Sequence, residues 1–493
     1  MEGQSAAIAR AWSPREFSAA ATEWQRLLTA HLEQVMSGST KVLNWAEPDQ
    51  TAAAADEWLN RPLADGPEGV AGGMRSLLQQ MLSSGQNLHH PHYIGHQVPA
   101  ASPLAGLLDA AAGVTNQVMA IYEMGPWATA VERALIGRLC GLAGWQPAAS
   151  SGVLTHGGSL ANLTALLTAR NVVLKDSWKD GVPAGTAMVA NADVHYCITR
   201  AAGILGLGAA AVRRVPLDAR RRMDVQRLEE LLSELRRQNR PIVAVSACAG
   251  ATPTGAIDDL AAVSDVCRRH DVWMHVDAAH GGSLLFSRRW RSRLAGIEQA
   301  DSIVWDAHKM LFVPALCTAV LYRRRELRFE TFQQDAPYLF DPSAPGMADV
   351  DVGMRTVECT KRATGFGLWG LWALFGAELF EQLVDRMLQL TQGFWELLNA
   401  EADFETLHEP DCNILAFRHL PAAVRLLPLA EQNRFQRELR STLIREGHFY
   451  IVQTTLDGMA ALRTTIINPL TTEQDLRELL SAVRDVGRRV WNL

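Results

Sequence analysis

Two residues able to do acid, base or nucleophilic chemistry stand at the ends of apolar runs in this sequence. Asp277 lies near the end of the run VWMHVDA, and Lys309 follows the run SIVWD, 32 residues later. The chain has only 5 lysines, so a lysine here is not expected to be a solvated surface residue. A buried carboxylate is costly unless a cation or donor meets it, and a desolvated lysine can acquire the lowered pKa that Schiff-base formation requires.

A third feature is a glycine turn between an apolar run and a helix. Gly157, Gly158 and Ser159 follow SGVLTH and precede LANLTALLTARNVVLK, so backbone N–H groups at a helix start can approach a ligand. Phosphate is the natural ligand of such a turn. The dinucleotide spacing G-x-G-x-x-G and the P-loop lysine are both missing. Taken alone, the turn also fits a tight connection that binds nothing.

One cofactor, pyridoxal phosphate, accounts for all three features. Its phosphate fits the glycine turn, its ring nitrogen needs a carboxylate to stay protonated, and its aldehyde needs a lysine. Asp277 and Lys309 are expected at the same edge of a sheet if their strands are neighbours. On the sequence alone, Asp277 could instead cap the next turn.

The elements that must position these residues are short apolar strands that alternate with helices from about residue 100 to 375. Such alternation predicts an α/β fold with a mostly parallel, buried sheet whose carboxyl ends hold the ligand. The expected strands are 151–156, 186–191, 241–247, 272–278, 302–306 and 317–324.

The chain on either side of this region has a different pattern. Apolar residues at three- and four-residue steps between 15 and 85 predict a helical arm lying on another surface. After residue 376, helices mix with strand-like runs such as NILAFR, as in a small α+β domain. We therefore expect a helical N-terminal arm and dimerisation segment (1–95), a large α/β domain (96–375) and a small C-terminal domain (376–493).

The composition argues against several functional classes. A net charge of −6, with acids and bases mixed throughout, gives no basic face for nucleic acid. Apolar runs stay short of the ~18 residues that a membrane span needs. We expect no secretion signal, because the first residues lack a basic start followed by an apolar stretch. The 7 cysteines lack the spacing of a disulfide framework. We expect a cytoplasmic protein that acts on small molecules, with no metal at its site.

The motifs resemble those of the group II pyridoxal-phosphate decarboxylases, which act on glutamate, cysteine sulfinate, diaminobutyrate or aromatic amino acids. The resemblance runs from about residue 88 to about 475, and its motifs are THGGSLANL, ADVHYCITRAAGILGLG, AGATPTGAIDD, HVDAAHGG and SIVWDAHKM. It implies the aspartate aminotransferase-like fold (fold type I) with a seven-stranded sheet. It also implies a homodimer with an interfacial active site and α-decarboxylation of an L-amino acid.

The resemblance also implies roles for single residues. Lys309 would form the Schiff base, Asp277 would pair with the pyridinium nitrogen, and His195 would stack on the ring. Ala279 would pack beneath the ring, and Thr252 would contact its 3-oxygen region. The residues implied to bind the cofactor are Gly157, Gly158, Ser159, His195, Thr252, Asp277, Ala279, Asp306, His308 and Lys309.

A loop tyrosine completes the implied catalytic set of Lys309, His195 and Tyr338. Glutamate decarboxylases carry their catalytic tyrosine further along, where this chain has Gly346, whereas the tyrosine of aromatic decarboxylases matches Tyr338. Tyr338 is thus the candidate proton donor, or else it packs the loop base. Because relatives without this tyrosine can form aldehydes with oxygen, an aldehyde synthase is a competing hypothesis. A cofactor-free binding module is another, which the presence of both Lys309 and Asp277 disfavours.

Three residues are expected to bind the substrate. Arg463 resembles the arginine that faces the substrate carboxylate in glutamate decarboxylases, and a guanidinium suits that contact; it could also hold a structural group. His96 and Gln97 lie in a stretch that resembles the pocket lining. These residues favour an aspartate-like or glutamate-like substrate, with diaminobutyrate and aromatic amino acids as alternatives. Tyr122 and Glu123 are candidates to approach the partner subunit's cofactor.

Overall fold

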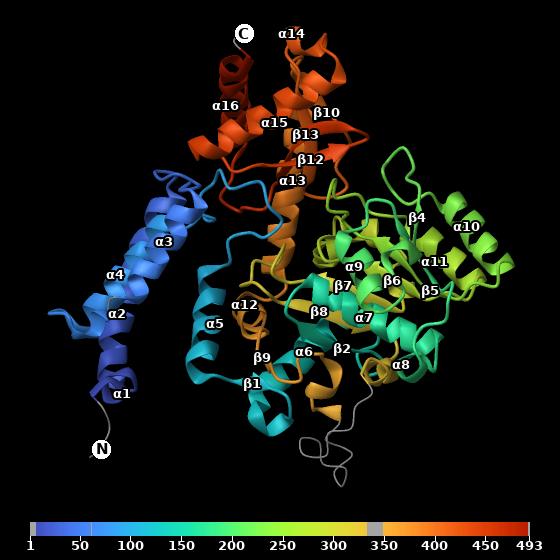
Figure 1. Ribbon diagram of the computed structural model, residues 1–493, viewed down its shortest axis with the longest axis horizontal. Coiled ribbons are helices and arrows are strands. Elements are labelled where there is room, and N and C mark those ends of the chain that lie inside the picture. The colour runs from blue at the N-terminus through green and yellow to red at the C-terminus, as the bar shows by residue number, and fades with distance from the viewer. Residues whose placement is uncertain (1–5, 61, 333–348, 492–493) are drawn as a thin grey trace.

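A seven-stranded sheet lies at the centre of the computed structural model, which describes residues 6–60, 62–332 and 349–491 (Figure 1). Strand β8 is antiparallel to both of its neighbours, and the other paired strands are parallel. The strand order is β2 (Ser151–Thr155), β8 (Thr318–Tyr322), β7 (Ser302–Asp306), β6 (Met274–Asp277), β5 (Ile242–Cys248), β3 (Ala187–Asn191) and β4 (Val212–Val215).

Helices cover the sheet, and the central strands are buried along their whole length. Apolar side chains therefore fill both faces, as the continuous apolar runs predict. The helices of this region are α5 (Pro103–Thr115), α6 (Pro126–Leu142), α7 (Gly158–Val173), α8 (Ser177–Asp180), α9 (Tyr196–Ile204), α10 (Val225–Arg237), α11 (Leu260–Arg269) and α12 (Phe366–Phe375). A short ribbon pairs β1 (Val118–Met119) with β9 (Lys361–Arg362).

All six expected strands are present, so the mostly parallel α/β fold is confirmed. Strand β4 was not anticipated, because its sequence VRRV places two arginines on an edge strand, where charge is common. The direction of β8 has a simple cause. Residues 307–317 are too few for a helical crossover, so β7 and β8 pair as antiparallel neighbours.

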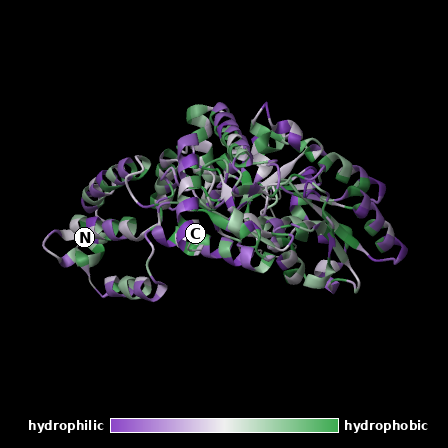
Figure 2. Ribbon diagram, turned by 90° about the horizontal axis from the view of Figure 1, so that it is seen from above, coloured by the Kyte–Doolittle hydropathy of each residue, from purple (hydrophilic) through white to green (hydrophobic). Residues whose placement is uncertain are grey.

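The N-terminal arm consists of helices that stand away from the sheet (Figures 1 and 2). Helix α2 (Pro14–Met36) packs along α4 (Gly69–Ser84), and Arg75 joins them through an ion pair of 3.0 Å with Glu23. Helices α1 (Ala6–Ala11) and α3 (Pro48–Leu59) complete the arm. Large apolar side chains of the arm remain exposed, namely Ile8, Trp12, Phe17, Trp45, Leu59, Leu77 and Met81.

A smaller antiparallel sheet and its helices form the C-terminal part, at the top of Figure 1. The strand order is β10 (Phe404–Thr406), β11 (Ile414–His419), β13 (Met459–Thr465) and β12 (Val452–Leu456). Its helices are α13 (Glu378–Ala400), α14 (Ala422–Arg425), α15 (Leu429–Glu446) and α16 (Glu473–Trp491). A separate apolar core lies between this small sheet and its helices.

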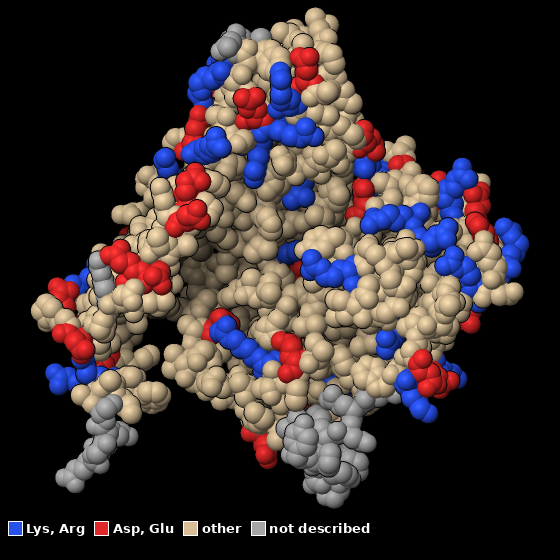
Figure 3. Space-filling view, in the orientation of Figure 1, with Lys and Arg blue, Asp and Glu red and all other residues tan. Residues whose placement is uncertain are grey.

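Acidic and basic side chains are interspersed over the face shown in Figure 3. None of the helices in the described ranges combines the length and apolar character that crossing a bilayer requires.

Candidate active site

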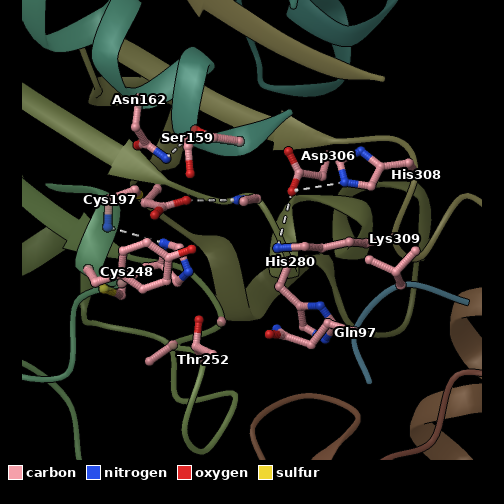
Figure 4. A pocket seen from close by; sticks show the side chains of 18 of the residues that line it. Gln97, Ser159, Asn162, Cys197, Cys248, Thr252, His280, Asp306, His308 and Lys309 are labelled. Atoms are coloured by element: carbon pink, nitrogen blue, oxygen red, sulfur yellow. Dashed lines mark hydrogen bonds and ion pairs between the residues drawn. The ribbon is translucent and has the colours of Figure 1, made fainter. Parts of the chain in front are cut away.

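A cavity of about 450 Å³ opens at the carboxyl ends of the central strands (Figure 4). It is where ligands bind in open α/β sheets. It brings together most of the residues that the sequence predicts for a site. Those that line it are His96, Gln97, Gly158, Ser159, His195, Thr252, Asp277, Ala279, Asp306, His308, Lys309 and Arg463.

Asp277 and Lys309 reach this cavity from adjacent strands, as expected. Strand β6 ends at Asp277, whose register partner on parallel β7 is Val304, and Lys309 follows the end of β7. Lys309 Nζ lies 3.1 Å from Asp306 Oδ2, so the amine is held by a carboxylate of its own strand. We call Asp277, Asp306, Lys309 and the start of α7 the strand-end half of the cavity.

Asp306 is the most fully bonded carboxylate of the strand-end half. It accepts a hydrogen bond of 2.6 Å from the hydroxyl of Thr318, and His308 Nε2 lies 3.8 Å away. A Cβ added at Gly158 would lie 3.1 Å from Asp306 Oδ2, a tight contact that glycine avoids where α7 begins. The positive end of the helix dipole therefore opens into the cavity beside Asp306.

Asp277 is the less satisfied carboxylate. Burial raises its pKa, and the nearby Lys309 amine lowers it in part. Its Oδ1 accepts one hydrogen bond of 3.2 Å, from the backbone N–H of Ala279. A buried carboxylate with one weak bond is suited to a cationic group on a ligand.

His195 lies across the cavity as the N-cap of α9. Its Nδ1 accepts a bond of 3.3 Å from the N–H of Cys197, which leaves Nε2–H as the donor of the neutral ring. Burial lowers the pKa of His195, with the carboxylate of Asp277 opposing that effect. The imidazole is therefore neutral near pH 7.

His96 and Gln97 are positioned by a docked stretch of chain. Ile94 donates its N–H to the carbonyl of Tyr450, and a Cβ at Gly95 would lie 2.8 Å from that carbonyl oxygen. Only glycine allows this close approach to the small sheet. The side-chain Nε2 of Gln97 is buried and has no hydrogen-bond partner among the described residues. Burial lowers the pKa of His96, and the neighbouring Arg463 adds to that effect.

Arg463 comes from β13 of the small sheet and is 7% exposed. It donates a hydrogen bond of 2.6 Å from an Nη to the carbonyl of Thr252, on the large-sheet side of the cavity. Its Nε has no partner within the described part of the chain. Burial lowers the pKa of Arg463 to about 10, so the guanidinium stays charged at neutral pH.

His280 also lines the cavity, although the sequence motifs predicted no role for it. Its Nε2 lies 2.6 Å from Oδ1 of Asn413, whose amide donates to the carbonyl of Ile466. Nε2 therefore carries the proton, and Nδ1 is a bare acceptor, buried without a donor among the described residues. Burial lowers the pKa of His280 to about 3. We call His96, Gln97, His280 and Arg463 the junction half, since they lie where the two sheets meet.

Other predicted residues lie elsewhere. Gly157 precedes the lining residues and adopts φ 101°, a backbone conformation that favours glycine. Tyr122 is exposed on the surface, and its N–H donates to Asp351 at 2.9 Å, while the neighbouring Glu123 is also exposed. Tyr338 lies outside the described residues.

Further lining residues had weaker signals in the sequence. Asn162 follows Ser159 by one turn of α7, and Cys248 ends β5, so their places followed from the predicted elements. His280 stands within the motif HVDAAHGG. Close packing explains the two glycines that follow it. A Cβ at Gly281 would lie 2.5 Å from the carbonyl oxygen of Ala249.

The donor set fits pyridoxal phosphate. An amine, a buried carboxylate with one weak hydrogen bond and a helix start next to a glycine are the groups that its aldehyde, ring nitrogen and phosphate require. In the junction half, Gln97 Nε2, His280 Nδ1 and Arg463 Nε are buried without partners among the described residues, so room and hydrogen-bonding capacity remain for a second molecule.

Comparisons with known proteins agree with this fit. Residues 64–420 match the pyridoxal-dependent decarboxylase conserved domain. The chain is 30% identical to cysteine sulfinic acid decarboxylase of Rattus norvegicus over 463 residues, which cover 92% of each protein. The crystal structure of mouse CSAD superposes with a TM-score of 0.87 at 27% identity, over 96% of this chain and 99% of that one.

A more distant structure shares the fold. Oryza sativa TDC, solved with PLP and tryptamine, has a TM-score of 0.88 at 22% identity, over 97% of this chain and 99% of its own. The family match, the relative and the cavity lead to one conclusion. The chain belongs to the pyridoxal-dependent decarboxylases, enzymes that release carbon dioxide from an amino acid with pyridoxal phosphate as cofactor.

Proposed function

We propose that the protein is an α-decarboxylase of an L-amino acid whose side chain is acidic, either a carboxylate or a sulfinate. Arg463 carries this proposal, because its charged and buried guanidinium faces the cavity with an Nε that has no partner within the described ranges. A guanidinium can bind the two oxygens of a carboxylate through two parallel hydrogen bonds, and a sulfinate also presents two acceptor oxygens. The similarity to cysteine sulfinic acid decarboxylase supports the same substrate class.

We propose that the strand-end half holds the cofactor. Lys309 would bind its aldehyde, Asp277 would keep a proton on its ring nitrogen, and the N–H groups of Gly158 and Ser159 would receive its phosphate. His195 and Ala279 would hold the two faces of the ring, with Thr252 at its edge. The further cofactor-binding proposals are Gly157, Asp306 and His308. The bound cofactor supplies an electron sink for the pair left when carbon dioxide departs.

The protein's own residues would orient the substrate and move its protons. Arg463 and Gln97 would fix the distal acid, which aims the α-carboxylate away from water. Neutral His195 can donate from Nε2, and Lys309 can return a proton to Cα once its amine is free. Tyr338 remains the proposed alternative donor for that step.

We propose that two copies assemble into a homodimer with the site near their interface. The arm exposes large apolar side chains, and so does the neighbouring surface with Leu104, Leu107, Val114, Leu374 and Phe375. Apolar patches of this extent mark interaction surfaces. Light scattering at micromolar concentration tests this, because a monomeric mass would reject it. We also propose a cytoplasmic location, since all 7 cysteines are unpaired.

Carbon dioxide release from a panel of L-amino acids tests the proposed reaction. Cysteine sulfinate, glutamate and aspartate should have the highest kcat/KM, with diaminobutyrate and tryptophan far below. Hydrogen peroxide is measured in the same assay, because its formation would indicate an aldehyde synthase. A preference for diaminobutyrate or an aromatic amino acid would reject the acidic substrate class.

A further inference from the structure

The chain between α4 and α5 is fixed against the small C-terminal domain before it reaches the active site. Tyr450 donates its N–H to the carbonyl of His92 at 3.1 Å, and Ile94 donates its N–H to the carbonyl of Tyr450 at 3.2 Å. His92 therefore has a firmly held backbone, four residues ahead of His96 in the active-site cavity.

The imidazole of His92 is held on two sides. Its ring stacks on that of Phe449, with 3.9 Å between the ring centroids and 9° between the planes. Its Nδ1 lies 3.1 Å from the backbone carbonyl oxygen of His448. Because a carbonyl oxygen can only accept a hydrogen bond, Nδ1 carries the proton, and Nε2 of the neutral ring is an acceptor.

Two carboxylates of α16 face this acceptor nitrogen. Asp475 Oδ1 lies 3.0 Å from His92 Nε2, and Glu478 Oε2 lies 3.7 Å from the same nitrogen. One possible ligand atom from each of the three residues lies within 4.8 Å of the other two. Neither a carboxylate oxygen nor the acceptor nitrogen has a proton to share, so a cation between them would stabilise the arrangement.

The other oxygen of each carboxylate is bonded within the chain. Asp475 Oδ2 accepts hydrogen bonds from the N–H and from the hydroxyl of Thr472, both at 2.7 Å. Glu478 Oε1 accepts one of 3.0 Å from the side-chain amide of Gln474. All three side chains are thus oriented by a second partner, as metal ligands commonly are. The side chain of Glu478 is 49% exposed, against 19% for that of His92, so an ion can enter from the side of Glu478.

We propose that His92, Asp475 and Glu478 bind one divalent transition-metal ion, for which zinc is the representative probe. One imidazole nitrogen and two carboxylate oxygens form a ligand set that zinc accepts, with water in the fourth position. Magnesium fits less well, because it prefers oxygen ligands alone. The two carboxylates neutralise the charge of the ion. None of the three ligands is among the described residues that line the active-site cavity, so the site is separate from that of the cofactor.

The bound ion links two segments that are far apart in the sequence. His92 precedes the stretch that carries His96 and Gln97 into the active site, whereas Asp475 lies 383 positions later, in the first turn of α16. An ion that binds only the folded chain stabilises it. Zinc should therefore raise the thermal unfolding midpoint of the protein.

Titration calorimetry of the chelator-treated holoenzyme with zinc chloride tests the proposal. We expect binding of zinc in the micromolar range and a higher unfolding midpoint, with much weaker binding of magnesium chloride at equal ionic strength. In His92→Gln, which removes the nitrogen ligand, the affinity for zinc should fall about a hundredfold.

A milder pair of variants keeps the test valid if His92→Gln disturbs the docked chain. Glu478→Gln removes a ligand with a half-exposed side chain, whereas Glu473→Gln removes an exposed charge from the first turn of the same helix and leaves the three ligands intact. The affinity for zinc should fall about tenfold in the first variant and stay unchanged in the second.

Anomalous diffraction at the zinc edge, from crystals of the zinc-loaded holoenzyme, locates the ion. A peak about 2.0 to 2.2 Å from one atom of each ligand is expected. The proposal is overturned if zinc does not bind, if magnesium binds equally well, if Glu478→Gln and Glu473→Gln bind zinc with the same affinity, or if no peak lies between the three side chains.

Discussion

The two halves of the active-site cavity differ in how completely their polar atoms are bonded. In the strand-end half, Asp306 is met by Lys309 at 3.1 Å and by Thr318 at 2.6 Å. In the junction half, Gln97, His280 and Arg463 each keep one buried nitrogen without a partner among the described residues. Unpaired buried polar atoms are rare in folded proteins, because each costs about 1 to 3 kcal/mol.

The polar groups of the strand-end half are therefore largely satisfied without a ligand, whereas those of the junction half are not. The strand-end half derives from one rigid sheet and has its charges largely paired within it, apart from Asp277. The junction half lies where two sheets meet. Its unsatisfied donors and acceptor are available to form hydrogen bonds with a substrate. Substitutions should therefore affect the reaction as a whole in the first half and the choice of substrate in the second.

The largest effect is expected from Lys309→Ala in the strand-end half. Because the proposed covalent attachment of the cofactor is lost, kcat should fall by roughly four orders of magnitude for every substrate. After reduction with borohydride, the variant should also lack the absorbance band of the covalently attached cofactor. Lys175→Ala, at an exposed lysine, serves as the control and should keep both. Retained borohydride labelling in Lys309→Ala would show that another amine binds the aldehyde.

Asp277→Asn should lower kcat/KM by about a thousandfold, because a neutral amide cannot hold the ring proton. The cofactor-free protein should become more stable. The folded-state pKa of Asp277 is raised above its ordinary value of 3.8, so its contribution to stability decreases as the pH rises through that range and is unfavourable at pH 7. Asp306→Asn provides the contrast, since it removes paired bonds and should destabilise. Urea unfolding of both variants without cofactor gives the comparison.

Arg463→Met should separate the halves most clearly. For an acidic substrate, kcat/KM should fall about a hundredfold, as expected when a buried charged contact is lost. For neutral amino acids, the low activity should be nearly unchanged. Arg418→Met is the matched control, because Arg418 is also buried, on the neighbouring strand β11, and does not line the cavity. An equal loss for acidic and neutral substrates would mean that Arg463 acts only by holding the carbonyl of Thr252.

The sequence could predict the strand-end half because local patterns determine it. Apolar runs of strand length, followed by Asp277 and Lys309, place both residues at one edge of a parallel sheet. The glycine turn before α7 was equally visible. The orientation of β8 also follows from chain length once the short connection at 307–317 is considered.

The junction half could not be derived in the same way. His280 owes its tautomer to Asn413, 133 positions away, and Arg463 bonds to Thr252 across 211 positions. The periodicity of apolar residues cannot indicate contacts between such distant positions. The resemblance to a family was therefore needed to single out Arg463, and His280 was missed. The stacked pair of Tyr93 and Tyr450, which helps to carry His96 and Gln97 into the cavity, is also a contact between distant segments.

The smallest effect is expected when two buried histidines are compared, His275 beneath the strand-end half and His280 in the junction half. His275 lies under the strand-end half, and both of its ring nitrogens are bonded, at 2.9 Å to Ser302 and at 2.7 Å to Asn162. His280 has one bonded nitrogen. Burial lowers the pKa of each to about 3, from an ordinary value of 6.5. Both rings are thus neutral in the folded protein and become protonated mainly after unfolding.

A folded pKa below the unfolded one means that stability is present above the ordinary pKa of 6.5 and is lost as the pH falls from there toward 3. Protonation of each histidine in the unfolded chain should lower the free energy of unfolding by about 1 kcal/mol between about pH 7 and about pH 5.5. This decrease should be absent for the replaced histidine in His275→Gln and in His280→Gln. The cost at pH 7 should differ, because His275→Gln breaks two bonds and His280→Gln only one. Urea unfolding of the cofactor-free variants measures both quantities. Equal costs at pH 7 would mean that the free nitrogen of His280 is satisfied without a substrate, which would remove the distinction between the two halves.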